Sequence, residues 1–126
     1  MKTTAGLEGR IVPALLVRDM QETLAFYRTL GFRLTGCHPD QDEPTWAEVG
    51  RDHVVFQFHT EPPEGTPAAP VCSGTFYLFP ESVAALAEEF RGRVEFAWGP
   101  ETMDYGMYEF GIRDPNGYWL AFAEPV

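Results

Sequence analysis

The sequence predicts an α+β fold in which two βαβββ modules form a curled, cup-shaped mixed β-sheet with helices on its outer face. Three observations lead to this prediction. The order strand, helix and three strands occurs twice, a proline-rich segment separates the two occurrences, and most strands alternate between apolar and polar residues. We expect one domain over residues 1–126, with module one at about 10–60, a linker at 61–70 and module two at about 72–124.

In the first module, the almost wholly apolar stretch 11–17 ends at Arg18-Asp19, which is typical of a buried strand followed by a helix N-cap. From Met20 to Leu30 the apolar residues recur at helical spacing, and Gly31 stands where a helix favours a left-handed residue. An acidic loop with Asp40, Asp42 and Glu43 interrupts the strands that follow. We predict these strands over 32–37, 45–49 and 54–59.

The linker contains four prolines and a glycine, which prevents a regular strand or helix. The same order of elements then recurs. A strand over 75–79 precedes the helix start Pro80-Glu81-Ser82, and Gly92 ends the helix. The tight turn Asp114-Pro115-Asn116-Gly117 joins the last two strands. The predicted helix covers 83–90, and the predicted strands cover 94–98, 107–113 and 118–123.

With 126 residues, 44% of them hydrophobic and 14% aromatic, the chain can bury a core without disulfides. Cys37 and Cys72 have no disulfide or zinc-binding spacing. No stretch has the length or composition of a signal peptide or membrane span, so we expect a cytoplasmic protein with no membrane partner. The formal charge of −10 argues against nucleic acid; it indicates either solubility alone or a preference for cationic ligands.

Two motifs at opposite ends of the chain carry a family resemblance. The first comprises Leu15-Leu16-Val17-Arg18-Asp19, Thr23-Leu24-Ala25-Phe26-Tyr27 and Leu30-Gly31-Phe32. The second runs from Phe110 through Asp114-Pro115-Asn116-Gly117 to Leu120. Together they resemble the first strand, the helix and the closing hairpin of the vicinal oxygen chelate superfamily, which includes glyoxalases, bleomycin-resistance proteins and extradiol dioxygenases.

The resemblance implies four metal-ligand positions, in the first and last strand of each module. In this chain they fall on Val12, Gln57, Thr75 and Ala121, none of which is a histidine or a carboxylate. We therefore expect no metal and no other cofactor. If the alignment is shifted by one residue, the positions fall on the other face of the strands, which carries no metal-binding side chain either. A two-residue shift in the fourth strand brings in His59 near Glu48 or Glu109, which leaves an atypical metal site open as an alternative.

The same strand phase predicts which side chains line the cup. Phenylalanines on the opposite, helix-facing side are assigned to the core: Phe26, Phe32, Phe56, Phe76 and Phe122. The connection before the seventh strand holds Trp98, Met103, Tyr105 and Tyr108, which form either a pocket rim or a surface turn with an anchoring tyrosine. The predicted ligand-binding residues are aromatic, acidic or polar: Trp46, Glu48, Val55, Gln57, His59, Thr75, Tyr77, Phe79, Glu109 and Trp119.

The main functional hypothesis is a metal-independent small-molecule binding protein, similar to bleomycin-resistance proteins, that sequesters an aromatic or cationic ligand. This is an antibiotic-resistance type of function, and the resemblance implies a homodimer in which the first half of one chain meets the second half of the other. The alternative is a glyoxalase- or dioxygenase-related enzyme with an atypical metal site or a carboxylate base; the candidate catalytic residues are Glu48, Glu109 and His59. A third hypothesis is a dimeric interaction module whose cup Trp46 and Trp119 fill.

Overall fold

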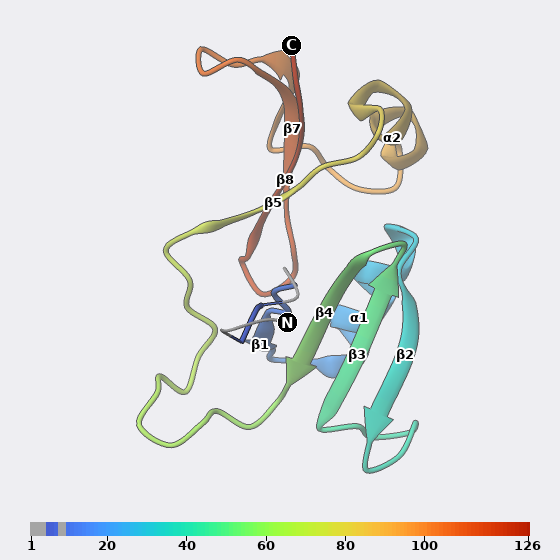
Figure 1. Ribbon diagram of the computed structural model, residues 1–126. Coiled ribbons are helices and arrows are strands. Elements are labelled where there is room, and N and C mark those ends of the chain that lie inside the picture. Colours follow the sequence, from blue (N-terminus) through green and yellow to red (C-terminus); the bar gives the residue numbers. More distant parts are fainter. Residues whose placement is uncertain (1–4, 8–9) are drawn as a thin grey trace.

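The computed structural model describes residues 5–7 and 10–126, and it divides the chain into two βαβββ modules (Figure 1). Each module has its own four-stranded sheet, in which the first strand pairs in parallel with the last strand of the same module. The first module contains β1 (Ala14–Leu16), α1 (Met20–Thr29), β2 (Arg33–His38), β3 (Trp46–Arg51) and β4 (Val54–His59). The second contains β5 (Thr75–Leu78), α2 (Val83–Phe90), β6 (Trp98–Thr102), β7 (Met107–Arg113) and β8 (Trp119–Pro125).

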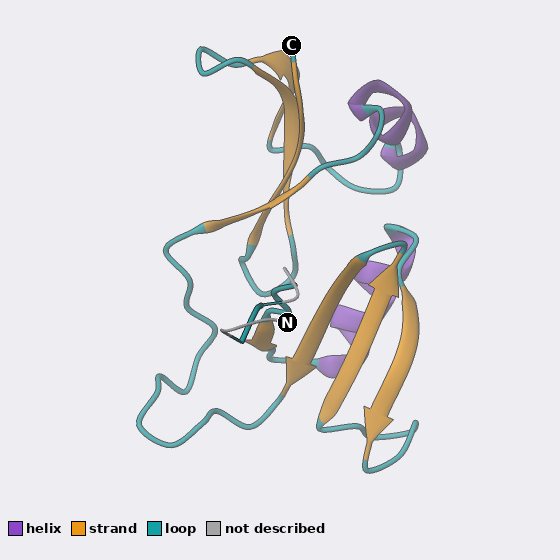
Figure 2. Ribbon diagram, in the orientation of Figure 1, coloured by secondary structure: helices purple, strands orange, loops and turns teal. Residues whose placement is uncertain are grey.

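The strand orders β1-β4-β3-β2 and β5-β8-β7-β6 confirm the predicted α+β class and the repeated module. The eight strands nevertheless form two separate sheets. Figure 2 shows the first sheet face-on with α1 behind it, whereas the second sheet is seen nearly edge-on with α2 to one side. Each sheet thus has one face covered by its helix and one face that we call its open face.

Both predicted helices are present with the expected capping residues. The side chain of Asp19 accepts a hydrogen bond from the backbone N–H of Glu22, and that of Ser82 accepts one from Ala85. Gly31 follows the first helix with φ +86°, a left-handed conformation that glycine adopts without steric cost. The first strand is shorter than predicted, since β1 begins only at Ala14, directly after Pro13.

The prediction of a strand over 94–98 is wrong. Residues 95–97 form a connection, and the strand β6 begins at Trp98, where the predicted strand ends. Gly99 and Pro100, which belong to the connection expected before the seventh strand, lie inside β6. The sheet tolerates them because β6 is an edge strand and its register shifts between Trp98 and Glu101. A proline on an edge strand needs no ladder partner for its missing N–H.

The helix-facing sides of both sheets contribute to one hydrophobic cluster. Phe32, Phe56 and Phe122 are buried in it as predicted, and Phe26 and Phe76 pack against it half-buried. The rings of Phe56 and Phe76 meet edge to face at 6.1 Å, which joins the core side of the first module to that of the second. This shared core fixes which face of each sheet remains open.

The β7–β8 turn joins the modules through polar contacts with α1. The Tyr27 hydroxyl donates to Oδ2 of Asp114 at 2.9 Å, and Nδ2 of Asn116 donates to the Thr23 hydroxyl at 3.0 Å. The carboxylate of Asp114 also accepts the backbone N–H groups of Asn116 and Tyr118. Asp114 and Asn116 are both buried, so the turn serves as an interface between the modules.

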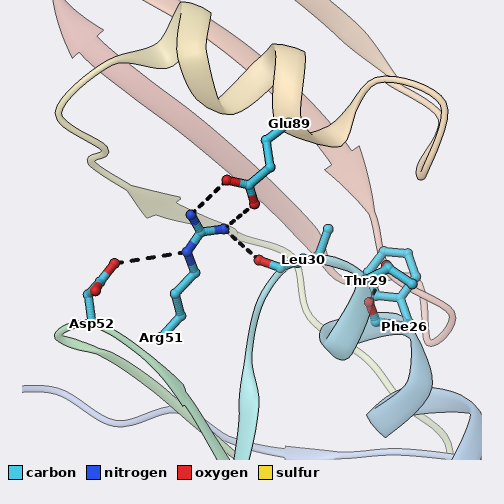
Figure 3. Close-up of polar contacts among 6 residues, drawn as sticks. All are labelled: Phe26, Thr29, Leu30, Arg51, Asp52 and Glu89. Atoms are coloured by element: carbon cyan, nitrogen blue, oxygen red, sulfur yellow. Dashed lines mark hydrogen bonds and ion pairs between the residues drawn. The ribbon is translucent and has the colours of Figure 1, made fainter.

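An ion pair makes a second link between the modules (Figure 3). The Arg51 guanidinium, at the end of β3, donates two hydrogen bonds to the carboxylate of Glu89 on α2, at 2.7 and 3.0 Å. Arg51 also donates a hydrogen bond to the carbonyl oxygen of Leu30 at 2.8 Å. This carbonyl lies at the end of α1, where a helix leaves its last carbonyl groups without intrahelical partners. The hydrogen bonds from Arg51 lower the pKa of Glu89.

Within the described part of the chain, neither helix has the length and apolar character that crossing a bilayer would demand.

Candidate functional site

The open face of the first module carries five of the predicted ligand-binding side chains. Trp46 lies opposite His59, and Glu48 lies opposite Gln57, across the β3–β4 ladder. Val55 follows on the same face, opposite Gly50. All five are half-buried. Nδ1 of His59 lies 2.9 Å from the carbonyl oxygen of Glu61, and none of the five side chains is hydrogen-bonded to another in the described residues.

The open face of the second module carries the other five. Thr75 on β5 pairs with Trp119 on β8, and Tyr77 pairs with Ala121. Phe79 lies just beyond the end of β5, and its ring stacks beside that of Tyr77 at 6.4 Å. Tyr77 and Phe79 are 44% and 65% exposed, which is unusual for large aromatic side chains. The fifth residue, Glu109 on β7, differs from the others because it is fully buried.

The buried carboxylate of Glu109 is held by two neutral donors. Nε1 of Trp98 donates to Oε2 at 2.8 Å, and the hydroxyl of Tyr105 donates to Oε1 at 2.6 Å. The hydroxyls of Tyr105 and Tyr77 lie 3.2 Å apart, which extends the network to β5. The hydrogen bond to Glu109 raises the pKa of Tyr105 and keeps the phenol protonated. Among the described residues, no Lys, Arg or His forms an ion pair with Glu109.

A glycine makes room for the indole that reaches Glu109. Trp98 pairs with Gly111 across the β6–β7 ladder, and the indole lies directly over Gly111, where the Cβ of any other residue would collide with the ring. The ring of Trp119 lies 5.8 Å from that of Trp98. The guanidinium of Arg113 lies over Trp119 at 4.9 Å, a cation–π contact at the other end of this aromatic surface.

The two open faces do not meet within one chain. In Figure 1 they point in different directions, and no hydrogen bond or aromatic contact among the described residues joins the first five side chains to the second five. Two cavities lie elsewhere: one of about 550 Å³ beside the β7–β8 turn and the linker, the other of about 650 Å³ between the modules near Arg51 and Glu89. Only Phe79 of the predicted ligand-binding residues lines either of them.

Comparison with known proteins agrees with this architecture. Residues 10–122 match the model of the Glyoxalase/Bleomycin resistance protein/Dioxygenase superfamily. The chain belongs to this superfamily. A search of curated protein sequences returns no significant match.

Solved structures of binding proteins and of an enzyme share the fold. A bleomycin-binding protein complexed with bleomycin has 20% identity and a TM-score of 0.71, and the match covers 93% of this chain and 98% of that chain. The antibiotic binding protein TnmS3 from a Streptomyces species has 19% identity, a TM-score of 0.72 and full coverage of both chains. Lactoylglutathione lyase from Agrobacterium tumefaciens has 17% identity, a TM-score of 0.71 and coverage of 95% and 96%. At such identities the likeness establishes the fold alone.

The metal positions that the superfamily resemblance implies hold poor donors in this chain. Gln57 and Thr75 offer one amide and one hydroxyl oxygen, and Val12 and Ala121 offer no donor atom. Ala121 is fully buried beside Tyr77 and Gly111. Within the described residues, no group of three or more His, Cys, Asp and Glu side chains gathers in a way that could hold a metal ion. The donor set therefore does not fit a divalent cation.

The structure adds residues that the sequence did not place at the site. The sequence left open whether Trp98 and Tyr105 form a pocket rim or a surface turn. In the structure, both side chains donate hydrogen bonds to Glu109. Gly111 and Arg113 appeared only within the closing motif and were given no role at the site. A glycine in the middle of an apolar strand was the signal for Gly111, because such a glycine often marks the close approach of another group.

Proposed function

We propose that the protein binds a small aromatic, cationic molecule and sequesters it without a metal and without chemical conversion. The observation that carries the proposal is the Glu109 carboxylate, which is fully buried and hydrogen-bonded to Trp98 and Tyr105, with no cationic partner among the described residues. A buried anion is costly unless it is hydrogen-bonded and paired. A positively charged ligand would supply the missing charge, and the aromatic rings would contact its flat faces.

We further propose that the binding site is complete only in a homodimer. Each chain presents two half-cups, which are the two open faces described above, and they point in different directions. A two-fold dimer in which the first half-cup of one chain faces the second half-cup of its partner would form two equivalent sites. Trp46, Glu48 and His59 of one protomer would then face Tyr77, Glu109 and Trp119 of the other. The related bleomycin-binding and antibiotic-binding proteins make sequestration the function to test first.

Mixing two defective variants tests both parts of the proposal. Trp46→Ala removes an aromatic wall from the first half-cup, and Trp119→Ala removes one from the second. Each homodimer should lose binding of a flat aromatic cation in a calorimetric titration. After co-refolding, about one site in four should recover, because each mixed dimer pairs one intact first half-cup with one intact second half-cup.

Each possible result of this mixing experiment has a distinct meaning. A site built within one chain would give no recovery, and that result would reject the shared cup. Full affinity in both single variants would reject the assignment of the open faces as the binding site. A thermal-shift screen of aromatic cations supplies the first ligand, since binding to the native state raises its apparent melting temperature.

The enzyme alternative is tested by metal content. Elemental analysis of the purified protein should find no stoichiometric nickel, iron, zinc or manganese, and EDTA should leave the melting temperature unchanged. A stoichiometric metal would reject the metal-independent proposal. Glu109 is a poor candidate for a general base because each of its oxygens already accepts a hydrogen bond.

A further inference from the structure

Two donors cap Glu109, and their side chains are packed to different extents. Trp98 is fixed: its indole lies against Gly111 in a strand and near the ring of Trp119. Tyr105 lies in the turn between β6 and β7, is 58% exposed, and makes no aromatic ring contact in the described residues. In the part of the chain that the structure describes, the hydrogen bonds of its side chain are those of the hydroxyl, with Glu109 and Tyr77.

The turn that carries Tyr105 is well defined in its backbone. The backbone N–H of Met103 donates to the carbonyl of Met107 at 2.7 Å, and that of Gly106 donates to Met103 at 3.0 Å. Gly106 adopts φ +88°, which glycine tolerates and most residues do not. A rotation of the Tyr105 side chain alone would therefore expose Oε1 of Glu109 without any change in the turn.

We propose that Tyr105 is a displaceable cap, which a ligand carrying a cationic N–H group replaces at Oε1 of Glu109. This inference rests on the proposed function and names its ligand class as flat aromatic amidinium or guanidinium cations. Such a group restores the hydrogen bond that Tyr105 gives up and adds the positive charge that the phenol lacks. The Nε1 donor of Trp98 stays on Oε2 throughout, so the carboxylate keeps its orientation.

The cap also makes the site selective. A neutral ligand without an N–H donor gains nothing by displacing Tyr105, because Glu109 would lose a short charge-assisted hydrogen bond and receive none in return. A cation without an N–H donor restores the charge but not the hydrogen bond. When the Tyr105 phenol leaves Glu109, it loses its hydrogen bond to a carboxylate. The neighbouring Tyr77 hydroxyl, 3.2 Å away, is a neutral group and does not replace that carboxylate. Selectivity thus comes from the cost of opening the cap.

Two probes of similar shape test the cap by calorimetry. Naphthamidine is a flat cation with N–H donors, and the corresponding naphthyl methyl ketone is neutral and has none. Tyr105→Phe removes only the capping hydroxyl, so naphthamidine should bind about tenfold more tightly while the affinity for the ketone changes by less than about twofold.

Glu109→Gln should reduce the affinity for naphthamidine to that for the ketone. Tyr108→Phe, on the same turn-bearing hairpin but outside the network, is the control and should change neither affinity.

A spectroscopic readout follows the cap directly. With a heavy carbon isotope at Cζ of tyrosine, the Tyr105 resonance should move when naphthamidine is added and stay in place when the ketone is added. Equal gains for both probes in Tyr105→Phe would mean that the hydroxyl merely obstructs the site, and no gain for naphthamidine would mean that it never leaves Glu109; either result overturns the cap. If wild type binds both probes in a Trp119-dependent way, the proposed function survives such a failure. If no variant binds either probe, both proposals fall.

Discussion

The two open faces use a similar pair of residues in opposite ways. In each module a tryptophan ring lies close to a glycine of the neighbouring strand, but only in the second module are the two residues paired across the ladder; in the first, Gly36 pairs with Glu48. In the first module Trp46 is on β3 and Gly36 on the edge strand β2, with the nearest ring carbon 3.4 Å from where a Cβ of residue 36 would be. In the second module the positions are exchanged: Trp98 is on the edge strand β6 and lies directly on Gly111 of β7. A Cβ at residue 36 would make ordinary contact with the Trp46 indole, whereas a Cβ at residue 111 would overlap the Trp98 indole. The position of Trp98 therefore requires a glycine at residue 111.

This difference separates a loose face from a preorganised one. Trp98 lies directly on Gly111, and its Nε1 donates to Glu109, where Tyr105 and Tyr77 complete a hydrogen-bonded network. Trp46, Glu48 and His59 form no such network in the described residues. Preorganised polar groups lose less entropy when a ligand binds. In the proposed shared site, the second module would fix the orientation of the ligand and the first would supply an adaptable opposite wall.

The largest expected difference between the modules concerns their hairpin turns. Asp114→Ala removes a carboxylate that accepts two backbone N–H groups and the Tyr27 hydroxyl, and it leaves that hydroxyl unpaired in the core. The free energy of unfolding should fall by about 3 kcal/mol. Asp52→Ala, in the exposed β3–β4 turn, should cost about 1 kcal/mol or less, mainly through its positive φ of 52°. Urea denaturation measures both. Similar losses in the two variants would show that the β7–β8 turn is no special interface.

A second, smaller difference should appear at the two glycines. Gly111→Ala places a Cβ inside the Trp98 ring, so the indole must move away and Glu109 loses a donor; we expect about 2 kcal/mol of destabilisation and a changed tryptophan emission. Gly36→Ala needs only a small adjustment of the Trp46 ring and should change stability by at most about 0.5 kcal/mol in either direction. If the two variants are equally stable, the contrast between a fixed and a loose indole is wrong.

The sequence predicted the repeated elements and the two faces of each sheet well, because both follow from local patterns. Alternation along β4 assigned Phe56 to the core and Gln57 to the open face, and the structure agrees. Helix caps at Asp19 and Ser82 were equally local. The position of β6 was not predicted correctly, because Gly and Pro interrupt most strands. They are tolerated here because β6 is an edge strand with a register shift.

The partners of Glu109 were beyond the reach of pattern analysis for a different reason. Alternation placed Glu109 on the open face correctly, but it gave no sign that the side chain is fully buried. Burial depends on Trp98, whose register passes through an irregularity in β6, and on a turn residue, Tyr105. Contacts of this kind are set by three-dimensional packing. The division of the cup into two sheets that face different ways is likewise a matter of how the modules dock.

The smallest effect tests the link between the modules and depends on pH. The Arg51 hydrogen bonds lower the pKa of Glu89 in the folded protein, so the ionised form stabilises the fold. This contribution is complete above the ordinary glutamate pKa of 4.5 and is lost as the pH falls through the lower folded value. Glu89→Gln should therefore cost about 1 kcal/mol near neutral pH, a modest amount because solvent screens the half-exposed pair. The difference from wild type should vanish in acid.

Glu88→Gln is the matched control, since the exposed Glu88–Arg91 pair joins α2 to the residue that follows it and does not link the modules. This substitution should cost no more than about 0.3 kcal/mol. Stability curves from urea denaturation across the acid range measure both, and a pH-independent loss for Glu89→Gln would show that the link between the modules is not the ion pair.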